Sequence, residues 1–153
     1  MLAAGLLLIH LVSFAAYLGA GFGQLQLMKR SRAEGITPEV RADREALAAG
    51  IVTKIELPAI MGSIASGVGF ILQNPAVMKF GWLHGKLLCV LVLALLSHAE
   101  MFNARAIVKV RAARGDAGKD EIEARKKRHE LLGLAGSLLV VAILILVTFV
   151  RFG

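Results

Sequence analysis

Residues 80–100 read FGWLHGKLLCVLVLALLSHAE, and this stretch decides the fold. Its apolar body is long enough for a helix to cross a bilayer, which takes about 20 apolar residues. The same stretch carries His84, Lys86, His98 and Glu100. An ionisable side chain in hydrocarbon costs at least about 2.5 to 3.5 kcal/mol on insertion scales, so such residues are functional candidates by default. We therefore interpret the rest of the chain as partners of this helix.

The chain has 153 residues, of which 57% are hydrophobic, and its apolar residues gather in four windows: 2–28, 51–73, 80–102 and 131–149. In lipid only helices and closed barrels satisfy the backbone, and no window shows the alternating pattern of a strand. The sequence therefore predicts an all-α integral membrane protein, a single domain over residues 1–153 that forms a four-transmembrane-helix bundle. Thr37-Pro38-Glu39 is typical of a helix start, and we expect a short amphipathic helix at 38–49.

The net charge of +7 comes mainly from two connections, the one between the first two windows and the one between the last two. Only Lys79 and Arg151 flank the opposite side. The positive-inside rule then predicts that both long connections are cytoplasmic and that the N- and C-termini lie outside, as in a bacterial-type inner (plasma) membrane. Because this topology accounts for the charge, we expect contact with membrane lipid and none with nucleic acid.

The first window carries a polar stripe on an otherwise apolar cylinder. His10, Ser13, Tyr17 and Gln24 fall within about 60° of one another at 3.6 residues per turn, so the stripe is expected to face the bundle. The single cysteine, Cys89, excludes an intrachain disulfide and a cysteine-cluster metal site. We find no nucleophile constellation, phosphate-binding loop or tetrahedral metal spacing.

The outer level of the bundle is predicted to contain His10 and His84. Under the expected topology their helices run in the same direction, and the two histidines differ in depth by only about 3 Å, which would let both imidazoles approach one ligand. The structural alternative is an interhelical hydrogen bond, worth about 0.6 to 2 kcal/mol in membranes. Lys86 would either serve the same ligand or extend to the head groups.

An inner level follows about 21 Å further along the helix, at His98. Glu56 and Glu100 belong to this level, as do His129 and Glu130 at the entrance of the last helix. Carboxylates beside imidazoles can tune tautomers or relay protons, and the alternative is that these residues are only interfacial. Two histidine levels on one helix are similar to di-haem cytochromes b, but only the outer level has a matching histidine, which favours one porphyrin-sized site.

The order of motifs resembles a known family. His10 on a glycine-bearing helix is followed by Lys54-Ile-Glu-Leu-Pro58-Ala59 and by Trp82-Leu83-His84-Gly85-Lys86-Leu87, with His98 late in the same helix. This pattern, over about the first hundred residues, resembles the HemJ-type protoporphyrinogen oxidases and the wider CopD-like group of membrane proteins. The resemblance implies a helical membrane oxidoreductase that oxidises protoporphyrinogen IX to protoporphyrin IX and is associated with haem b.

Carried over residue by residue, the resemblance implies His10 and His84 as metal ligands, His10 and Lys86 as catalytic residues, and Lys86 as a contact of a porphyrin propionate. His98 and Tyr17 complete the expected cofactor contacts. The family's aromatic-Pro-Arg end of the first helix is replaced here by residues 21–26, and its Asn-Glu-x-Pro-like element by residues 128–132. These differences keep a second hypothesis open: a non-catalytic accessory subunit of a larger membrane complex or homo-oligomer, or a CopD-like metal-handling protein.

Overall fold

The computed structural model describes residues 2–150, and all regular structure within this range is helical. This confirms the all-α prediction. The elements in order are α1 (Leu2–Arg30), α2 (Pro38–Ile51), the π-helical η1 (Val52–Glu56), α3 (Leu57–Gln73), the 3-10 helix η2 (Pro75–Lys79), α4 (Gly81–Arg114), the 3-10 helix η3 (Gly115–Gly118), α5 (Lys119–Ile145) and the π-helical η4 (Leu146–Val150).

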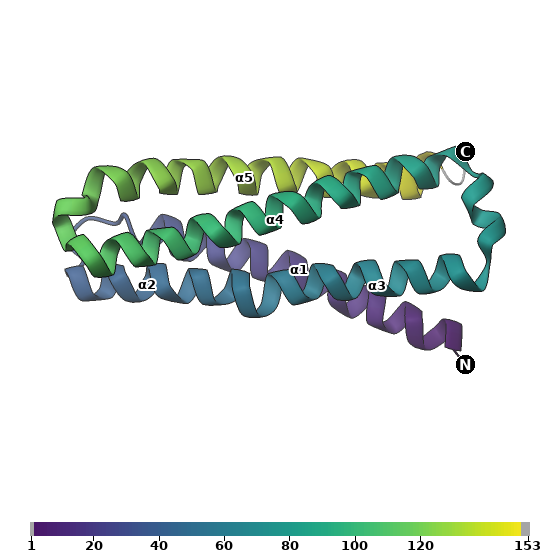
Figure 1. The fold of residues 1–153 in the computed structure, drawn as a ribbon, viewed down its shortest axis with the longest axis horizontal. Helices are drawn as coiled ribbons and strands as arrows, with labels where there is room; N and C mark the ends of the chain where they lie inside the picture. The colour runs from purple at the N-terminus through teal and green to yellow at the C-terminus, as the bar shows by residue number, and fades with distance from the viewer. Residues whose placement is uncertain (1, 151–153) are drawn as a thin grey trace.

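Three continuous helical stretches are long and apolar enough to cross a membrane: Leu2–Arg30, Pro38–Gln73 and Gly81–Phe149. The third stretch contains both α4 and α5, which fold back on each other at η3 and lie side by side (Figure 1). Many large apolar side chains, such as Leu8, Leu88 and Leu138, point outward and are more than half exposed. An apolar exterior of this kind fits an integral membrane protein.

The helices form one elongated bundle, in which α1 runs obliquely to α2 and α3 (Figure 1). α2, η1 and α3 follow one another along one side, α1 packs against them, and α4 pairs with α5 on the other side. α1 begins and α5 ends at the same end of the bundle, whereas η3 and the connection from α1 to α2 lie at the opposite end. The bundle therefore has a terminal end and a loop end.

The π-helical turn η1 results from the sequence immediately after it. Pro58 has no backbone N–H, and its ring would clash with the carbonyl group four residues earlier, which belongs to Lys54. The chain widens here, and the N–H of Leu57 bonds the carbonyl of Val52, five residues back. This turn places Glu56 on the inner side of the helix, where its side chain is only 1% exposed. Single π-turns of this kind are frequent at functional sites.

Two apolar cores divide the bundle along its length. The core of the apolar half, toward the terminal end, is formed by Tyr17, Ala59, Ile60, Leu93, Val140 and Ile143. The core of the charged half, toward the loop end, is formed by Met28, Ala48, Ala49, Ala104, Ile107 and Ile122. We define the charged half as α2 together with residues 102–130. Its exterior carries ion pairs. α4 ends there at Arg114 and is followed by Gly115, whose φ of +53° suits a glycine.

Candidate functional site

Polar side chains bridge the space between α1 and α4. No Cα atom of α1 lies within 8 Å of a Cα atom of α4, so only side chains connect the two helices. The hydroxyl groups of Tyr17 and Ser97 lie 3.4 Å apart, and the amide nitrogen of Gln24 donates a 3.4 Å hydrogen bond to Glu100. These four side chains are buried, which makes the contact region a polar layer inside the bundle.

His129 extends this polar layer from α5. Its Nε2 donates to the side-chain oxygen of Gln24, so that His129, Gln24 and Glu100 form a chain of hydrogen bonds across three helices. The imidazole is fully buried, and its Nδ1 has no hydrogen-bond partner among the described residues. Because the amide oxygen of Gln24 can only accept, Nε2 of His129 carries a proton.

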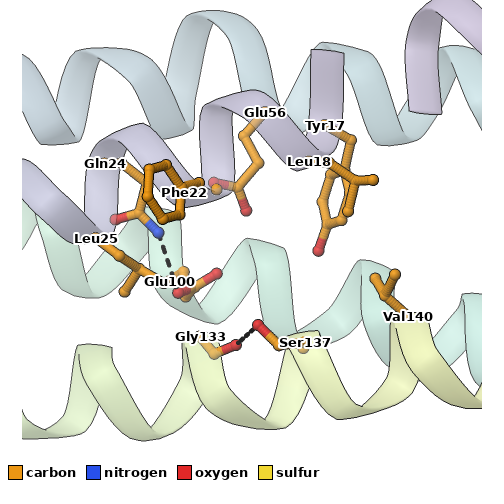
Figure 2. Close-up of a pocket in the computed structure, with 12 residues that line it drawn as sticks. Tyr17, Leu18, Phe22, Gln24, Leu25, Glu56, Glu100, Gly133, Ser137 and Val140 are labelled. Atoms are coloured by element: carbon orange, nitrogen blue, oxygen red, sulfur yellow. Dashed lines mark hydrogen bonds between the residues drawn. The ribbon is translucent and has the colours of Figure 1, made fainter. Parts of the chain in front are cut away.

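Glu56 joins the layer from η1. Figure 2 shows its carboxyl group directed toward Glu100 from the opposite side, and the two carboxyl groups are close enough to interact. The Oε2 atom of Glu56 is buried and has no hydrogen-bond partner in the described part of the chain. None of the ion pairs formed by the described residues includes Glu56 or Glu100. The pair is therefore a buried acidic site without a cation.

A cavity of about 260 Å³ lies beside this carboxyl pair, between α1 and α5 (Figure 2). Its polar groups are those of Tyr17, Gln24, Glu56, Glu100 and Ser137. The rest of the wall is apolar or glycine: Leu18, Gly21, Phe22, Leu25, Gly133, Gly136 and Val140. A mostly apolar cavity with a few convergent polar groups is the usual form of a small-molecule site.

His10 lies on α1 toward the terminal end and is held by α3. Its Nδ1 lies 3.0 Å from the carbonyl oxygen of Ser63 and 3.0 Å from the hydroxyl oxygen of Ser66. A carbonyl oxygen can only accept, so Nδ1 carries the proton and Nε2 is the nitrogen with the free lone pair. Phe70 packs edge-on against the ring at 6.3 Å between centroids. This is the tautomer of a histidine that binds a metal through Nε2.

The other expected members of the outer level are placed differently. Lys86 is half-buried and lies within electrostatic range of His10. His84 is exposed, and two residues of separation on a helix turn it by about 200° from Lys86. The structure thus brings His10 and Lys86 to one side of α4 and leaves His84 on another.

The two remaining expected contacts belong to other surroundings. The Nδ1 of His98 donates a 2.8 Å hydrogen bond to the carbonyl oxygen of Ala94, one turn earlier on its own helix. Tyr17 lies instead at the cavity beside Glu56 and Glu100. Within residues 2–150, no group of three or more His, Cys, Asp or Glu side chains is arranged to hold a metal ion.

The charged half contains a third buried carboxyl group, Glu45 of α2, which the sequence did not single out. Arg111 donates two hydrogen bonds of 2.9 Å to its two oxygens, and the Lys126 ammonium lies 2.7 Å from Oε1. Glu45 and Lys126 are both 0% exposed. Burial by itself would raise the pKa of Glu45, but Arg111 and Lys126 outweigh this effect and hold that pKa below its usual value.

Glu130, expected beside His129, is not part of the polar layer. It pairs with Arg32, which also contacts Glu123 at 2.9 Å on the outside of the charged half. By contrast, Glu56, Glu100 and His129 are buried inside the bundle. Comparison with protein-family models, with curated proteins and with solved structures finds no match for this chain.

Proposed function

We propose that the protein crosses the membrane four times, through residues 2–28, 51–73, 80–102 and 131–149, with both termini outside and both long connections in the cytoplasm. The support is the bundle's polarity: both basic connections lie at the loop end, away from the start of α1 (Figure 1). α4 has 34 residues, well beyond the roughly 20 needed for a crossing, so its last turns belong to the cytoplasmic charged half. A bacterial-type inner membrane is the proposed location.

Within this membrane domain, we propose a haem-b-binding or porphyrin-handling redox function. One observation carries the proposal: the Nδ1–H of His10 is fixed by the carbonyl of Ser63, which presents Nε2 as a ligand atom. The chemistry supplied by a bound haem would be one-electron transfer, while the protein orients it and sets its surroundings. Among specific activities, oxidation of protoporphyrinogen IX is the one that the sequence resemblance favours.

In this proposal, His10 and Lys86 would be the residues that hold the haem. His10 would hold the iron from α1, and the ammonium group of Lys86, within electrostatic range, would balance an acidic propionate. His84 is exposed here, so we propose it only as the second ligand to be tested. His98 and Tyr17 would act at most as peripheral contacts.

The absorption spectrum of the purified protein tests this function. After haem supplementation, we expect a Soret band and an α band on reduction with dithionite. The His10→Gln variant should lose both bands while it stays folded, because glutamine can still donate to Ser63 but is not a haem ligand. His84→Ala is the matched comparison for the second position. Absence of haem bands in the wild type, or unchanged bands in His10→Gln, would refute the assignment.

The alternative is a non-catalytic accessory subunit. It is favoured by α1, whose first turns expose Leu2, Leu7, Leu8 and Leu11 and diverge from the other helices (Figure 1). Helical turns that expose so many leucine side chains would suit packing against a partner helix in the membrane. Under this hypothesis the protein binds no haem, and crosslinking from residue 8 of α1 captures a second membrane protein or a second copy of the chain.

A further inference from the structure

We propose that the cavity between α1 and α5 binds a small organic monocation with an apolar body, and that Glu56 and Glu100 neutralise its charge. The site lies apart from His10 and does not depend on a haem. Its ligand class would be an alkyl- or aryl-substituted ammonium compound that reaches the cavity from the lipid phase.

The cavity wall contains a hydrogen-bond acceptor that has no partner among the described residues. Glu56 is 1% exposed, and its Oε2 is buried without a hydrogen-bond partner among the described residues. A buried polar atom without a partner destabilises the folded protein, and more so when it is charged. Figure 2 shows this carboxyl group directed into the space between the helices. A ligand that supplies positive charge there would remove this cost.

The described cavity wall contains acidic side chains but no basic one to balance their charge. No lysine or arginine lines the cavity, although the chain carries a net charge of +7. Glu45, equally buried, contacts two cationic side chains of the protein itself. A buried carboxylate stays charged only when a cation or hydrogen bonds compensate it, and otherwise it takes up a proton. Beyond their contact with each other, Glu56 and Glu100 receive from the described protein one weak hydrogen bond, which Gln24 donates to Glu100 at 3.4 Å, and no cation.

The walls of the cavity indicate the chemical class of the cation. A bare metal cation such as Ca²⁺ needs about six or more oxygen ligands, and the walls are mostly apolar or glycine. The volume of about 260 Å³ is just below the roughly 300–1,000 Å³ of drug-sized sites. Tyr17 and Phe22 add aromatic rings, which attract ammonium groups through their π faces. These walls suit a cation that carries about one ring or a short alkyl chain.

A ligand could enter the cavity from the outer surface of α1. Leu18 and Phe22 belong both to the cavity wall and to the outer surface of α1, where they are 41% and 69% exposed. In the proposed topology this surface faces lipid. Two glycines of the wall border open space: a Cβ at Gly21 would meet only Glu56 Oε2 at 4.0 Å, and one at Gly136 would have ordinary contacts of 3.6 and 3.8 Å.

The test measures the binding of benzyltrimethylammonium to the full-length protein in detergent by isothermal titration calorimetry. The control ligand is neopentylbenzene, which has the same shape with carbon in place of the charged nitrogen. We expect saturable binding of the cation and binding of the neutral analogue at least about tenfold weaker, because only the cation is attracted by the charge of a buried carboxylate. Equal binding of both compounds, or no binding of the cation, would overturn the proposal.

Two kinds of variant locate the site. Glu56→Gln and Glu100→Gln should each weaken cation binding by at least about tenfold, whereas Asp116→Asn, which removes one exposed carboxylate, should leave binding unchanged. Gly136→Leu keeps both carboxyl groups but fills the cavity, and it should abolish binding while the helical content and elution profile stay normal. If a glutamine variant does not fold, Gly136→Leu and the neutral analogue decide the question.

Two further outcomes are decisive. Tighter binding of the neutral donor hydroquinone than of the cation would overturn the proposal, because the site would then recognise hydrogen-bond donors rather than charge. His10→Gln should leave cation binding intact even if it removes haem, so this variant separates failure of the redox function from failure of the cation site. Cation binding that disappears in His10→Gln and persists in Gly136→Leu would place the site elsewhere and refute the assignment.

Discussion

Glu45 and the Glu56–Glu100 pair are buried to nearly the same degree in one helical bundle, but their surroundings differ. Glu45 receives two hydrogen bonds from Arg111 and an ion pair from Lys126. Glu56 and Glu100 have only each other and Gln24. Both sites connect helices that are distant in sequence, so the difference is one of charge balance rather than of position in the fold.

The difference indicates separate roles. A carboxylate that the protein neutralises by itself contributes to holding α2, α4 and α5 together in the charged half. A carboxyl pair without a cation contributes little to stability, because burial opposes its charge. Such a pair is retained where a ligand or a proton uses it. The charged half thus supplies stability, and the apolar half supplies the candidate binding site.

The largest effect is expected at Glu45. Glu45→Ala leaves Arg111 and Lys126 buried without their anion, and breaking a buried ion pair in this way costs about 3–5 kcal/mol. Unfolding in detergent, followed by circular dichroism, should show this loss. The double variant Glu45→Leu with Lys126→Met removes one charge of each sign and should recover part of it. A loss below about 1 kcal/mol in Glu45→Ala would mean that the cluster is not structural.

Acid should weaken the same cluster. The pKa of Glu45 is lower in the folded protein than in the unfolded chain, so the folded state binds fewer protons at acid pH. The stabilisation is complete above the unfolded pKa of about 4.3 and is lost as the pH falls through the lower folded pKa. The midpoint temperature of thermal unfolding should therefore decrease when the pH is lowered below about 4. In Glu45→Gln, the part of this decrease that comes from Glu45 should be absent. If the midpoint temperatures of the wild type and Glu45→Gln changed in parallel with pH, Glu45 would not be the source of the acid sensitivity.

The smallest effect is expected at Arg32, which pairs with Glu123 and Glu130 on the outside of the charged half. Its side chain is 25% exposed and those of its partners 36% and 43%, so water screens these charges. Arg32→Ala should cost at most about 1 kcal/mol, and the cost should shrink further at high salt. A loss as large as that of Glu45→Ala would remove the distinction between the buried and the exposed ion pairs.

The helical architecture could be predicted from apolar length alone. The windows at residues 2–28 and 80–102 fall within α1 and α4, except for Phe80, which precedes α4, because roughly 20 apolar residues in lipid leave the backbone no other choice. What length could not predict is the continuity of α2, η1 and α3. Thr37 indicated a helix start, but a proline inside a helix can kink it or widen it, and here Pro58 produces a π-turn.

The candidate site could be predicted only in part. The polar stripe on the first helix included both Tyr17 and Gln24, which do face the bundle. Glu56, Glu100 and His129 lie near the ends of apolar windows, where sequence position cannot distinguish a buried side chain from an interfacial one. Whether these three side chains lie close together depends on the direction in which η1 turns Glu56 and on the register between α1 and α5. Glu45 was missed because an acidic residue on an amphipathic helix normally faces water.

Matched glutamine substitutions test the comparison most directly. Glu45→Gln, Glu56→Gln and Glu100→Gln each replace one buried carboxyl group by a neutral side chain of the same shape, and their thermal unfolding can be compared in one detergent at neutral pH. We expect Glu45→Gln to lower the melting temperature strongly, and Glu56→Gln and Glu100→Gln to leave it unchanged or raise it. An equal decrease in all three variants would contradict the account, because the Glu56–Glu100 pair would then be structural as well.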